Sequence, residues 1–211
     1  MYTPEHFSEN RPEQLHQLIR QYPLGILITH GGDGLDANHL PFELLADQGP
    51  CGTLIGHVAR ANPLWREIGE GLDVLVVFRA EQAYLSPNWY PSKHEQHRQV
   101  PTWNYRVVHA HGRLRARDEE SFVRGVVARL TRTHEAQAAP DSPWKMTDSS
   151  PEYISQMLAA IVGIEIELTR LEGKFKLSQN KDARDIQGAA DGLQQQGKLQ
   201  LAADMRAAKP E

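Results

Sequence analysis

Residues 100–117 read VPTWNYRVVHAHGRLRAR, and this stretch decides the fold class. Apolar and polar side chains alternate from Arg106 to Arg117, and successive side chains of a strand point to opposite sides of a sheet. One side carries Val108, Ala110, Gly112, Leu114 and Ala116, and the other carries Val107, His109, His111, Arg113, Arg115 and Arg117. The alternation predicts a long antiparallel strand with one buried face and one basic, solvent-facing side.

Working outward, the same rules predict the other elements. We expect helices over 6–21, from Asn62-Pro63, over 118–130, from Ser150-Pro151 and as a pair between 182 and 208. We expect strands over 24–30, 35–45, 53–58, 74–78, 84–85 and 161–171. A hairpin turn is expected at 31–34, a short turn before Tyr84, a turn at Gly173, and loops over 91–99 and 136–148. Pro41 lacks an amide donor and therefore requires a sheet edge or a bulge. About seven strands with helices inserted between them predict an antiparallel barrel with peripheral helices.

Composition excludes several classes of protein. The chain has 211 residues, of which 40% are hydrophobic and 24% charged, as is typical of a soluble globular protein. No apolar run reaches the roughly 18 residues that span a membrane, and the polar N-terminus does not resemble a signal peptide. The single Cys51 is compatible with a reducing compartment, so we expect a cytoplasmic protein. The net charge of −4 argues against a broad nucleic-acid-binding surface.

Two aromatic clusters are candidates for a ligand pocket. One is Val100–Tyr105, and the other is Ser86–Lys93, which contains Trp89 and Tyr90. Aromatic rings with a few fixed polar groups, on loops at the ends of strands, are typical of small-molecule sites. The alternative is that these aromatic side chains belong to the hydrophobic core, because Trp and Tyr are commonly buried for packing.

A third motif, Arg60-Ala61-Asn62-Pro63, could bind an anion. Asn62 is a preferred N-cap and Pro63 a preferred first helical residue, so a helix is expected to begin here. Its N-terminus would present free N–H groups, and Arg60 could hold phosphate oxygens in two places. The alternative is an ordinary capped helix beside a surface arginine.

Taken together, several blocks resemble one family, the PaiB-like FMN-binding negative transcriptional regulators. The blocks are His39–Phe42, Gly56–Pro63, Ser86–Tyr90, Val100–Tyr105 and Lys176–Asn180. The resemblance implies a split β-barrel of the pyridoxamine-phosphate-oxidase-like type and a homodimer with FMN at its interface. It implies one FMN-binding domain over residues 1–180 and a helical extension over 181–211 packed on the same domain.

The resemblance also implies which residues bind FMN. These are His39, Leu40, Pro41, Phe42, His57, Arg60, Asn62, Trp89, Tyr90, Thr102, Trp103, Asn104, Lys176, Ser178, Gln179 and Asn180. Arg60 is the best candidate for the phosphate, while Lys176 could lie near the phosphate or near the electron-rich edge of the flavin ring. Any redox chemistry would be that of the flavin, in a reductase, an oxidase or a sensor, with the protein positioning it.

Two other functions stay open. Direct DNA binding is implied by the family's name, but residues 181–211 hold five basic and five acidic side chains, without the basic excess of a recognition helix. The best basic surface is the strand face with Arg113, Arg115 and Arg117. A metal or haem site could use His109 and His111, or His94 and His97, although zinc normally requires three or four ligands. Hydrogen-bonded or solvated histidines are the alternative.

Overall fold

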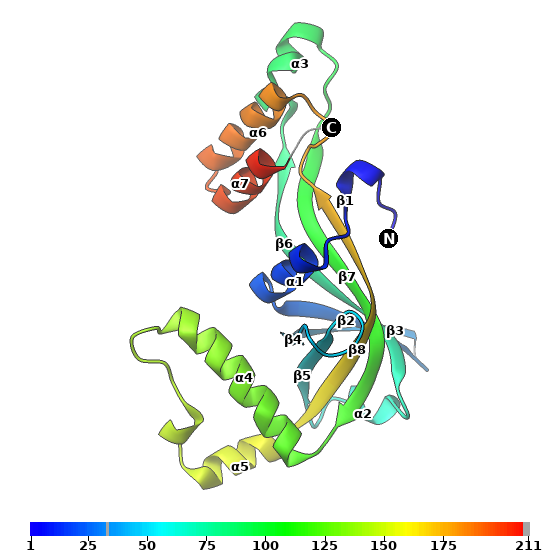
Figure 1. Cartoon of the computed structure of the whole chain (residues 1–211), viewed down its shortest axis with the longest axis vertical. Helices are drawn as coiled ribbons and strands as arrows, with labels where there is room; N and C mark the ends of the chain where they lie inside the picture. The colour runs from blue at the N-terminus through cyan, green and yellow to red at the C-terminus, as the bar shows by residue number, and fades with distance from the viewer. Residues whose placement is uncertain (33, 209–211) are drawn as a thin grey trace. The chain divides into compact units, whose positions relative to one another are not determined.

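The protein is built mainly from antiparallel strands, with helices between them along the chain (Figure 1). The computed structural model describes residues 1–32 and 34–208, so Asp33 of the expected turn lies outside the described residues. The strands are β1 (Ser8–Glu9), β2 (Leu24–Gly31), β3 (Gly34–Pro41), β4 (Glu43–Leu45), β5 (Thr53–Ala59), β6 (Leu72–Leu85), β7 (Thr102–Arg117) and β8 (Ile161–Lys176). The α-helices are α1 (Pro12–Gln21), α2 (Leu64–Glu67), α3 (Pro91–Gln96), α4 (Glu120–Ala138), α5 (Pro151–Ala159), α6 (Ala183–Gln195) and α7 (Leu199–Ala207), with short 3-10 turns at Glu5–Phe7, Pro87–Trp89 and Met146–Asp148.

The chain divides into two compact units. The first unit contains residues 1–18, 79–109 and 172–208, and the second contains residues 19–78 and 110–171. The long strands β6, β7 and β8 each contribute residues to both units.

In the second unit the strand order is β3-β2-β6-β7-β8-β5-β4. The β2–β3 hairpin pairs Leu24 with Pro41 and Gly31 with Gly34, as the sequence predicts. Among the described strands, the two ends of this order do not pair with each other, so the sheet stays open and is not closed into a barrel. The strand β3 is one of these ends, which gives Pro41 the edge position that its missing amide requires.

The core of the second unit lies on the side of the sheet that the alternation predicts. Leu27, Val76, Leu114 and Ile164 are completely buried. Burying an aliphatic side chain of this size contributes about 1.5–3 kcal/mol relative to leaving it exposed. The helix α4 adds Val126 and Leu130, which pack with Ile55 of β5 in a further apolar cluster.

In the first unit, strands β6, β7 and β8 are joined by β1, which pairs with β8. The helices α6 and α7 lie side by side (Figure 1), and their apolar faces bury Leu193, Leu201 and Met205. Arg106 of β7 forms an ion pair with Asp204 of α7 at 2.7 Å. The two C-terminal helices are thus confirmed, while the domain boundary at residue 180 stays a prediction.

The helix predicted over 6–21 begins only at Pro12, so the start of that prediction is wrong. Residues 8–9 form β1 instead, with Ser8 opposite Lys174 and Glu9 opposite Gly173. Residues 8–9 therefore pair with the distant strand β8 instead of forming the first turn of a helix. Arg11 reinforces this arrangement through a backbone and a guanidinium hydrogen bond to the carboxylate of Glu9, both at 2.9 Å.

The single strand predicted over 35–45 is also wrong, because it breaks at Phe42 into β3 and β4. The strand β3 pairs with β2, whereas β4 pairs with β5. The amide of Phe42 donates to the carbonyl of Pro23 at 2.9 Å. Its buried ring packs edge-to-face on Phe78, with ring centres 6.0 Å apart. Burial of this ring explains why the chain changes partner here rather than forming a simple bulge.

Further predictions fail because residues expected in turns or loops lie inside regular elements. The strand β6 is continuous from Leu72 to Leu85, without the turn expected before Tyr84. The strand β8 runs through Gly173, where a Cβ would lie 2.4 Å from a methyl carbon of Leu15, so this glycine permits close packing rather than a turn. The loops expected over 91–99 and 136–148 contain α3, the end of α4 and a 3-10 turn. The described residues form eight strands, where about seven were predicted.

Among the described residues, no helix combines the length and apolar character needed to cross a membrane.

Candidate functional site

The residues predicted to bind the cofactor fall into two groups, one in each unit. The first unit holds Trp89, Tyr90, Thr102, Trp103, Asn104, Lys176, Ser178, Gln179 and Asn180. The second holds His39, Leu40, Pro41, Phe42, His57, Arg60 and Asn62. Each group lies within its own unit.

Lys176, at the end of β8, is the central cation of the first group. Its ammonium donates to the hydroxyl of Thr102 and, at 2.5 Å, to the carbonyl of Trp103, both on β7. Among the described residues it forms no ion pair with a carboxylate. Partial burial lowers the pKa of Lys176, and the positive charges of Lys174 and Lys181 lower it further. An ammonium in this setting favours the approach of an anion.

Asn104 is completely buried, one residue after Trp103. Its amide nitrogen donates to the hydroxyl of Ser178 at 2.8 Å and lies 3.4 Å from the sulfur of Met205. Its side-chain oxygen has no hydrogen-bond partner in the described part of the chain. Ser178 has a φ of 69°, a left-handed conformation that is uncommon outside glycine. The side chain of Gln179 holds this turn by accepting from the amide of Leu177 and donating to the carbonyl of Phe175.

Trp103 is exposed, unlike a typical core tryptophan. Its side of β7 faces solvent, and 53% of the residue's surface is accessible. The indole packs edge-to-face against Tyr84 of β6, which is 47% exposed, with ring centres 6.1 Å apart. The first unit therefore displays an aromatic pair beside the backbone carbonyl that Lys176 binds.

Trp89 and Tyr90 have mainly structural surroundings. Trp89 packs on α6, where a Cβ at Gly192 would lie 2.4 Å from an indole ring carbon. Tyr90 is completely buried, and this burial raises the pKa of its phenol. The packing of Trp89 and the burial of Tyr90 agree with the alternative that these two side chains serve the hydrophobic core. Asn180, the last residue of the group, is exposed.

Sequence reasoning missed a buried polar network next to these residues. Lys181 donates to Gln99 at 2.6 Å, Gln99 donates to Ser92 at 2.7 Å, and the hydroxyl of Ser92 donates to Asp185 at 2.5 Å. Asp185 also accepts from the amide of Ser92 and is only 1% exposed. The network joins α3 to α6, and no local motif signals it because its members lie far apart in the sequence.

In the second unit, Arg60 is fully engaged by neighbouring groups. Its guanidinium binds the two carboxylate oxygens of Asp118 at 2.5 and 2.9 Å, and it donates to the carbonyls of Ala159 and Ile161. The hydrogen bond with Arg60 lowers the pKa of Asp118. The geometry predicted for phosphate, a guanidinium binding two oxygens, is thus realised here with a carboxylate of the same chain.

The helix predicted from Asn62-Pro63 exists but is short. It is α2, with Pro63 as its N-cap and only four residues. Asn62 accepts from the amide of Leu64 at 2.9 Å and donates to the side chain of Asn38 at 2.8 Å. Asn62 therefore ties the start of α2 to strand β3.

The remaining residues of this group lie on the nearby strands. His39 is exposed on the edge strand β3, Leu40 and Pro41 are half-buried, and Phe42 is in the core. His57, on β5, is partly buried, and this burial lowers the pKa of its imidazole. Its Nδ1 has no hydrogen-bond partner among the described residues. His57 is consequently a neutral side chain at neutral pH, with an acceptor or donor still available.

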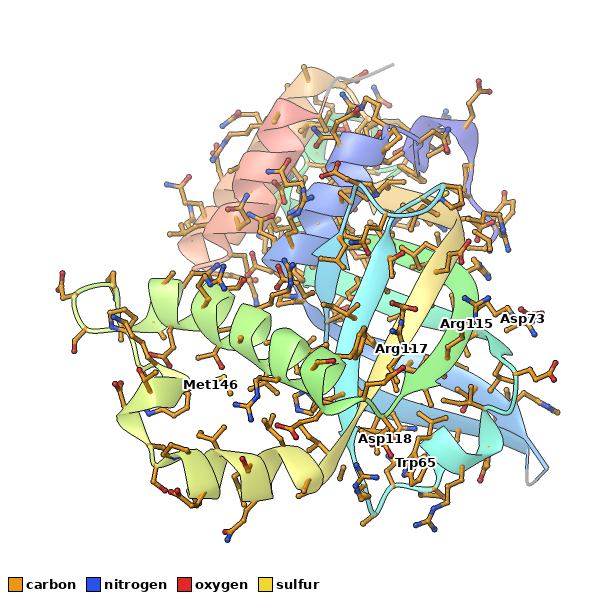
Figure 2. The ribbon with its side chains drawn as sticks, turned by 60° about the horizontal axis from the view of Figure 1, so that its bottom comes forward. Trp65, Asp73, Arg115, Arg117, Asp118 and Met146 are labelled. Atoms are coloured by element: carbon orange, nitrogen blue, oxygen red, sulfur yellow. The ribbon has the colours of Figure 1, made fainter. Side chains whose placement is uncertain are left out.

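The basic face of β7 is neutralised in the second unit. Arg113 lies 3.7 Å from Asp73, Arg115 lies 3.9 Å from Glu167, and Arg117 lies 3.0 Å from Glu165. Figure 2 shows Arg115 and Arg117 on this strand, with Asp73 at the neighbouring β6. A surface that attracts DNA requires unpaired positive charge, and these pairings remove most of it.

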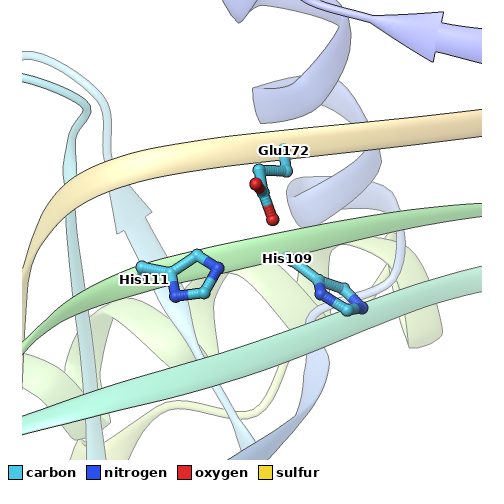
Figure 3. Close-up of side chains that lie close together, drawn as sticks. All are labelled: His109, His111 and Glu172. Atoms are coloured by element: carbon cyan, nitrogen blue, oxygen red, sulfur yellow. The ribbon is translucent and has the colours of Figure 1, made fainter. Parts of the chain in front are cut away.

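Of the four histidines considered for a metal site, His109 and His111 lie on β7 (Figure 3). His94 lies in α3, and His97 is the C-cap of that helix. In the first unit, a ring nitrogen of His109 lies within 4.8 Å of a carboxylate oxygen of Glu172 on β8, a neighbour that the sequence interpretation did not include. Glu172 also accepts from the amino group of Met1 at 3.0 Å. Glu172 thus adds a carboxylate to the histidines considered for this place. A metal at this place stays a hypothesis.

Comparison with known proteins identifies the class. Residues 1–170 match a family model described as “Putative FMN-binding domain”. The protease synthase and sporulation protein PAI 2 of Bacillus subtilis (strain 168) is 28% identical over 194 residues, covering 92% of this chain and 89% of that protein. The uncharacterized protein AN0679 of Emericella nidulans is 32% identical over 230 aligned positions, covering 93% of this chain and 92% of that protein.

A solved structure agrees with the fold. The FAD and heme binding protein from Mycobacterium smegmatis has a TM-score of 0.57 at 16% identity, covering 81% of this chain and 73% of that one. With the open antiparallel sheet, these findings define an FMN-binding protein of the split-barrel class, with FMN as its cofactor. The chain belongs to the FMN-binding domain family whose model spans residues 1–170. The mainly β fold and the family predicted from the sequence are both confirmed.

Proposed function

We propose that this protein binds FMN as a redox cofactor and that Lys176 recognises the anionic part of the flavin. The observation that carries the proposal is the ammonium of Lys176, held by Thr102 and Trp103 without a carboxylate partner among the described residues. Loss of a charge-assisted hydrogen bond of this kind costs about 1.5–3 kcal/mol.

The residues of the first unit fit the chemistry of FMN. The phosphate requires a cation, which Lys176 provides. The isoalloxazine ring requires an aromatic or apolar surface, which the exposed indole of Trp103 provides. The side chain of Asn104 is completely buried and projects from the side of β7 opposite to Trp103, so we do not assign it to the ring that Trp103 contacts. When bound, FMN supplies hydride and single-electron transfer, while these side chains hold and orient it.

The experiment is a titration of the protein with FMN and, separately, with riboflavin, which lacks the phosphate. Binding is measured as quenching of the flavin fluorescence. We expect Lys176→Met to weaken FMN binding by about ten- to a hundredfold and to change riboflavin binding by less than about twofold. The matched control is Lys198→Met in the same unit, whose ammonium already pairs with Glu81 at 3.4 Å. It should bind both flavins like the unmodified protein.

Either of two results would contradict this assignment. Equal loss of FMN and riboflavin would move Lys176 from the phosphate to the ring, and unchanged binding would remove it from the site. In the same assay, Arg60→Ala tests the phosphate role that the sequence predicts for Arg60. A colourless protein that takes up no FMN after incubation and dialysis would overturn flavin binding itself.

We further propose a homodimer. Tyr84 and Trp103 form an exposed aromatic pair, and Val100 close by is 72% exposed. Aromatic residues on a surface are enriched in protein interfaces. Sedimentation equilibrium should give twice the chain mass, and Trp103→Ser should shift the equilibrium towards monomer. A monomer at micromolar concentration would contradict the dimer.

A second candidate function is flavin-linked regulation in the cytoplasm, favoured by the similarity to PAI 2 of Bacillus subtilis. Because the arginines of β7 are paired with carboxylates, we expect any regulatory role to act through a partner protein or through the flavin state rather than by direct DNA binding. No mobility shift of DNA is expected at low ionic strength. A shift that disappears with salt would instead support direct binding.

A further inference from the structure

A cavity of about 540 Å³ lies in the second unit, between α4 and the segment that leads to α5. The helix contributes Ala128, Thr131 and Ala136, and the segment contributes Pro140, Trp144 and Met146. This volume falls within the roughly 300–1,000 Å³ range of small-molecule pockets. The residues that line it are separate from the predicted cofactor-binding residues.

The cavity lies along one side of α4. The helix residues that line it, Ala128, Thr131, Arg132, Glu135 and Ala136, recur at three- and four-residue spacing and so share this side. The side with Val126 and Leu130 is occupied by packing on Ile55. The facing segment lies across the other side of α4 and leaves a half-open space that neither element fills.

The facing wall is held in place by hydrogen bonds. Glu135 accepts from the amide of Trp144 at 2.8 Å, and Asp148 accepts from the amide of Lys145 at 3.0 Å. Met146 packs on an apolar cluster that contains Val123, Ile154 and Leu158, and Figure 2 shows it beside α4. A wall fixed in this way pre-organises the cavity and lowers the entropic cost of binding.

Unpaired positive charge lies beside this apolar space. Arg132 and Lys145 line the cavity, and neither forms an ion pair within the described part of the chain. The acidic lining residue, Glu135, already accepts the Trp144 amide. Charge complementarity therefore favours a ligand with an apolar body and an acidic group. The indole of Trp144 and the thioether of Met146 suit a flat aromatic body.

We propose that this cavity binds a small organic anion with a flat aromatic body. The aromatic body lies against Trp144 and Met146, and the acidic group is held by Arg132, whose guanidinium matches a carboxylate or sulfonate in two places. This site is independent of the FMN proposal, because none of the residues that line it is a predicted cofactor-binding residue.

Two fluorescent probes test the proposal on the full-length protein. The anionic probe is 8-anilinonaphthalene-1-sulfonate, and the neutral probe is N-phenyl-1-naphthylamine. We expect one anionic probe per chain. Arg132→Gln should weaken its binding by about tenfold and leave the neutral probe unchanged. The matched control Arg129→Gln, an exposed arginine of α4 outside the lining, should change neither.

Filling the cavity provides the decisive variant. Ala128→Phe should abolish binding of both probes. If this variant fails to fold, Ala136→Phe, at an exposed position, replaces it and should also abolish binding of both probes. The flavin content and the thermal midpoint report folding in each case. Undiminished probe binding in a folded, cavity-filled variant would overturn the proposal, as would equal binding of the anionic probe by Arg132→Gln and the unmodified protein.

Discussion

Arg60 binds both carboxylate oxygens of Asp118, at 2.5 and 2.9 Å, and thereby joins the end of β5 to the start of α4. The same guanidinium donates to the carbonyl of Ile161 at the start of β8. Four hydrogen bonds from one side chain hold three segments of the second unit together. This residue stabilises the fold by itself, whatever its role towards the cofactor.

The first prediction concerns this pair. Asp118→Asn should lower the thermal midpoint, since it weakens the contact that holds Arg60, and Arg60→Ala should lower it further because two carbonyl acceptors also lose their donor. The double variant should resemble Arg60→Ala rather than the sum of the two effects. Thermal unfolding followed by circular dichroism measures all three. Additive losses would show that Arg60 and Asp118 act independently.

The second prediction uses two glycines on helices. Gly192→Ala should destabilise the protein by about 1–3 kcal/mol, because the new methyl group would lie 2.4 Å from the indole of Trp89. Gly125→Ala is the matched control on α4, where nothing lies within 4 Å of the new Cβ, and it should stabilise by about 0.5–1 kcal/mol. Urea denaturation distinguishes the two signs. A neutral Gly192→Ala would mean that Trp89 moves aside freely.

The third prediction concerns the pH dependence of FMN binding. Burial lowers the pKa of Lys176 below the ordinary lysine value of 10.5, so the free protein loses this positive charge earlier as the pH rises. Binding of an anion favours the charged form, and FMN affinity should therefore decrease as the pH rises towards the ordinary lysine pKa. Lys176→Arg keeps its charge over this range and should show a flatter profile. Identical profiles would argue against contact between Lys176 and the anion.

The fourth prediction concerns His57. Burial lowers the pKa of this imidazole below 6.5, so the unfolded chain takes up a proton before the folded protein does. The contribution of His57 to stability is therefore present above about pH 6.5 and is lost as the pH falls towards the folded-state pKa. His57→Gln should show a smaller decrease in thermal midpoint between about pH 7 and about pH 5. An equal decrease would assign the acid sensitivity to other groups.

Sequence reasoning located the strongest elements because their patterns are local. The alternation after Arg106 reports burial on one side of β7, and Ser150-Pro151 reports a helix start that the structure confirms through the Ser150 side chain, which accepts from the amide of Tyr153. Sequence reasoning failed where contacts with residues far away in the sequence determine the local conformation. Gly173 resembles a turn glycine, yet it continues β8 because Leu15 and Glu9 leave no room for a side chain.

The candidate site follows the same division. The motif Arg60-Ala61-Asn62-Pro63 correctly predicts a helix start and a guanidinium that binds two oxygens, but no spacing rule reveals that Asp118 supplies them. Trp89 and Trp103 each lie in an aromatic cluster of the sequence, so the sequence alone does not distinguish their surroundings. One packs on a glycine-lined helix and the other is exposed, since the helix that covers the first lies about a hundred residues later in the chain.

The sequence by itself therefore determined the class of fold, the family and most of the helices and strands. Hydrophobic periodicity, helix caps and the blocks shared with the family each depend only on residues that are close together in the sequence. Only the tertiary structure decided which charges are paired, which aromatic rings are exposed and where a cavity remains. Those properties depend on contacts between residues far apart in the sequence, such as Lys176 with Thr102 and Arg60 with Asp118, which form only when the chain has folded.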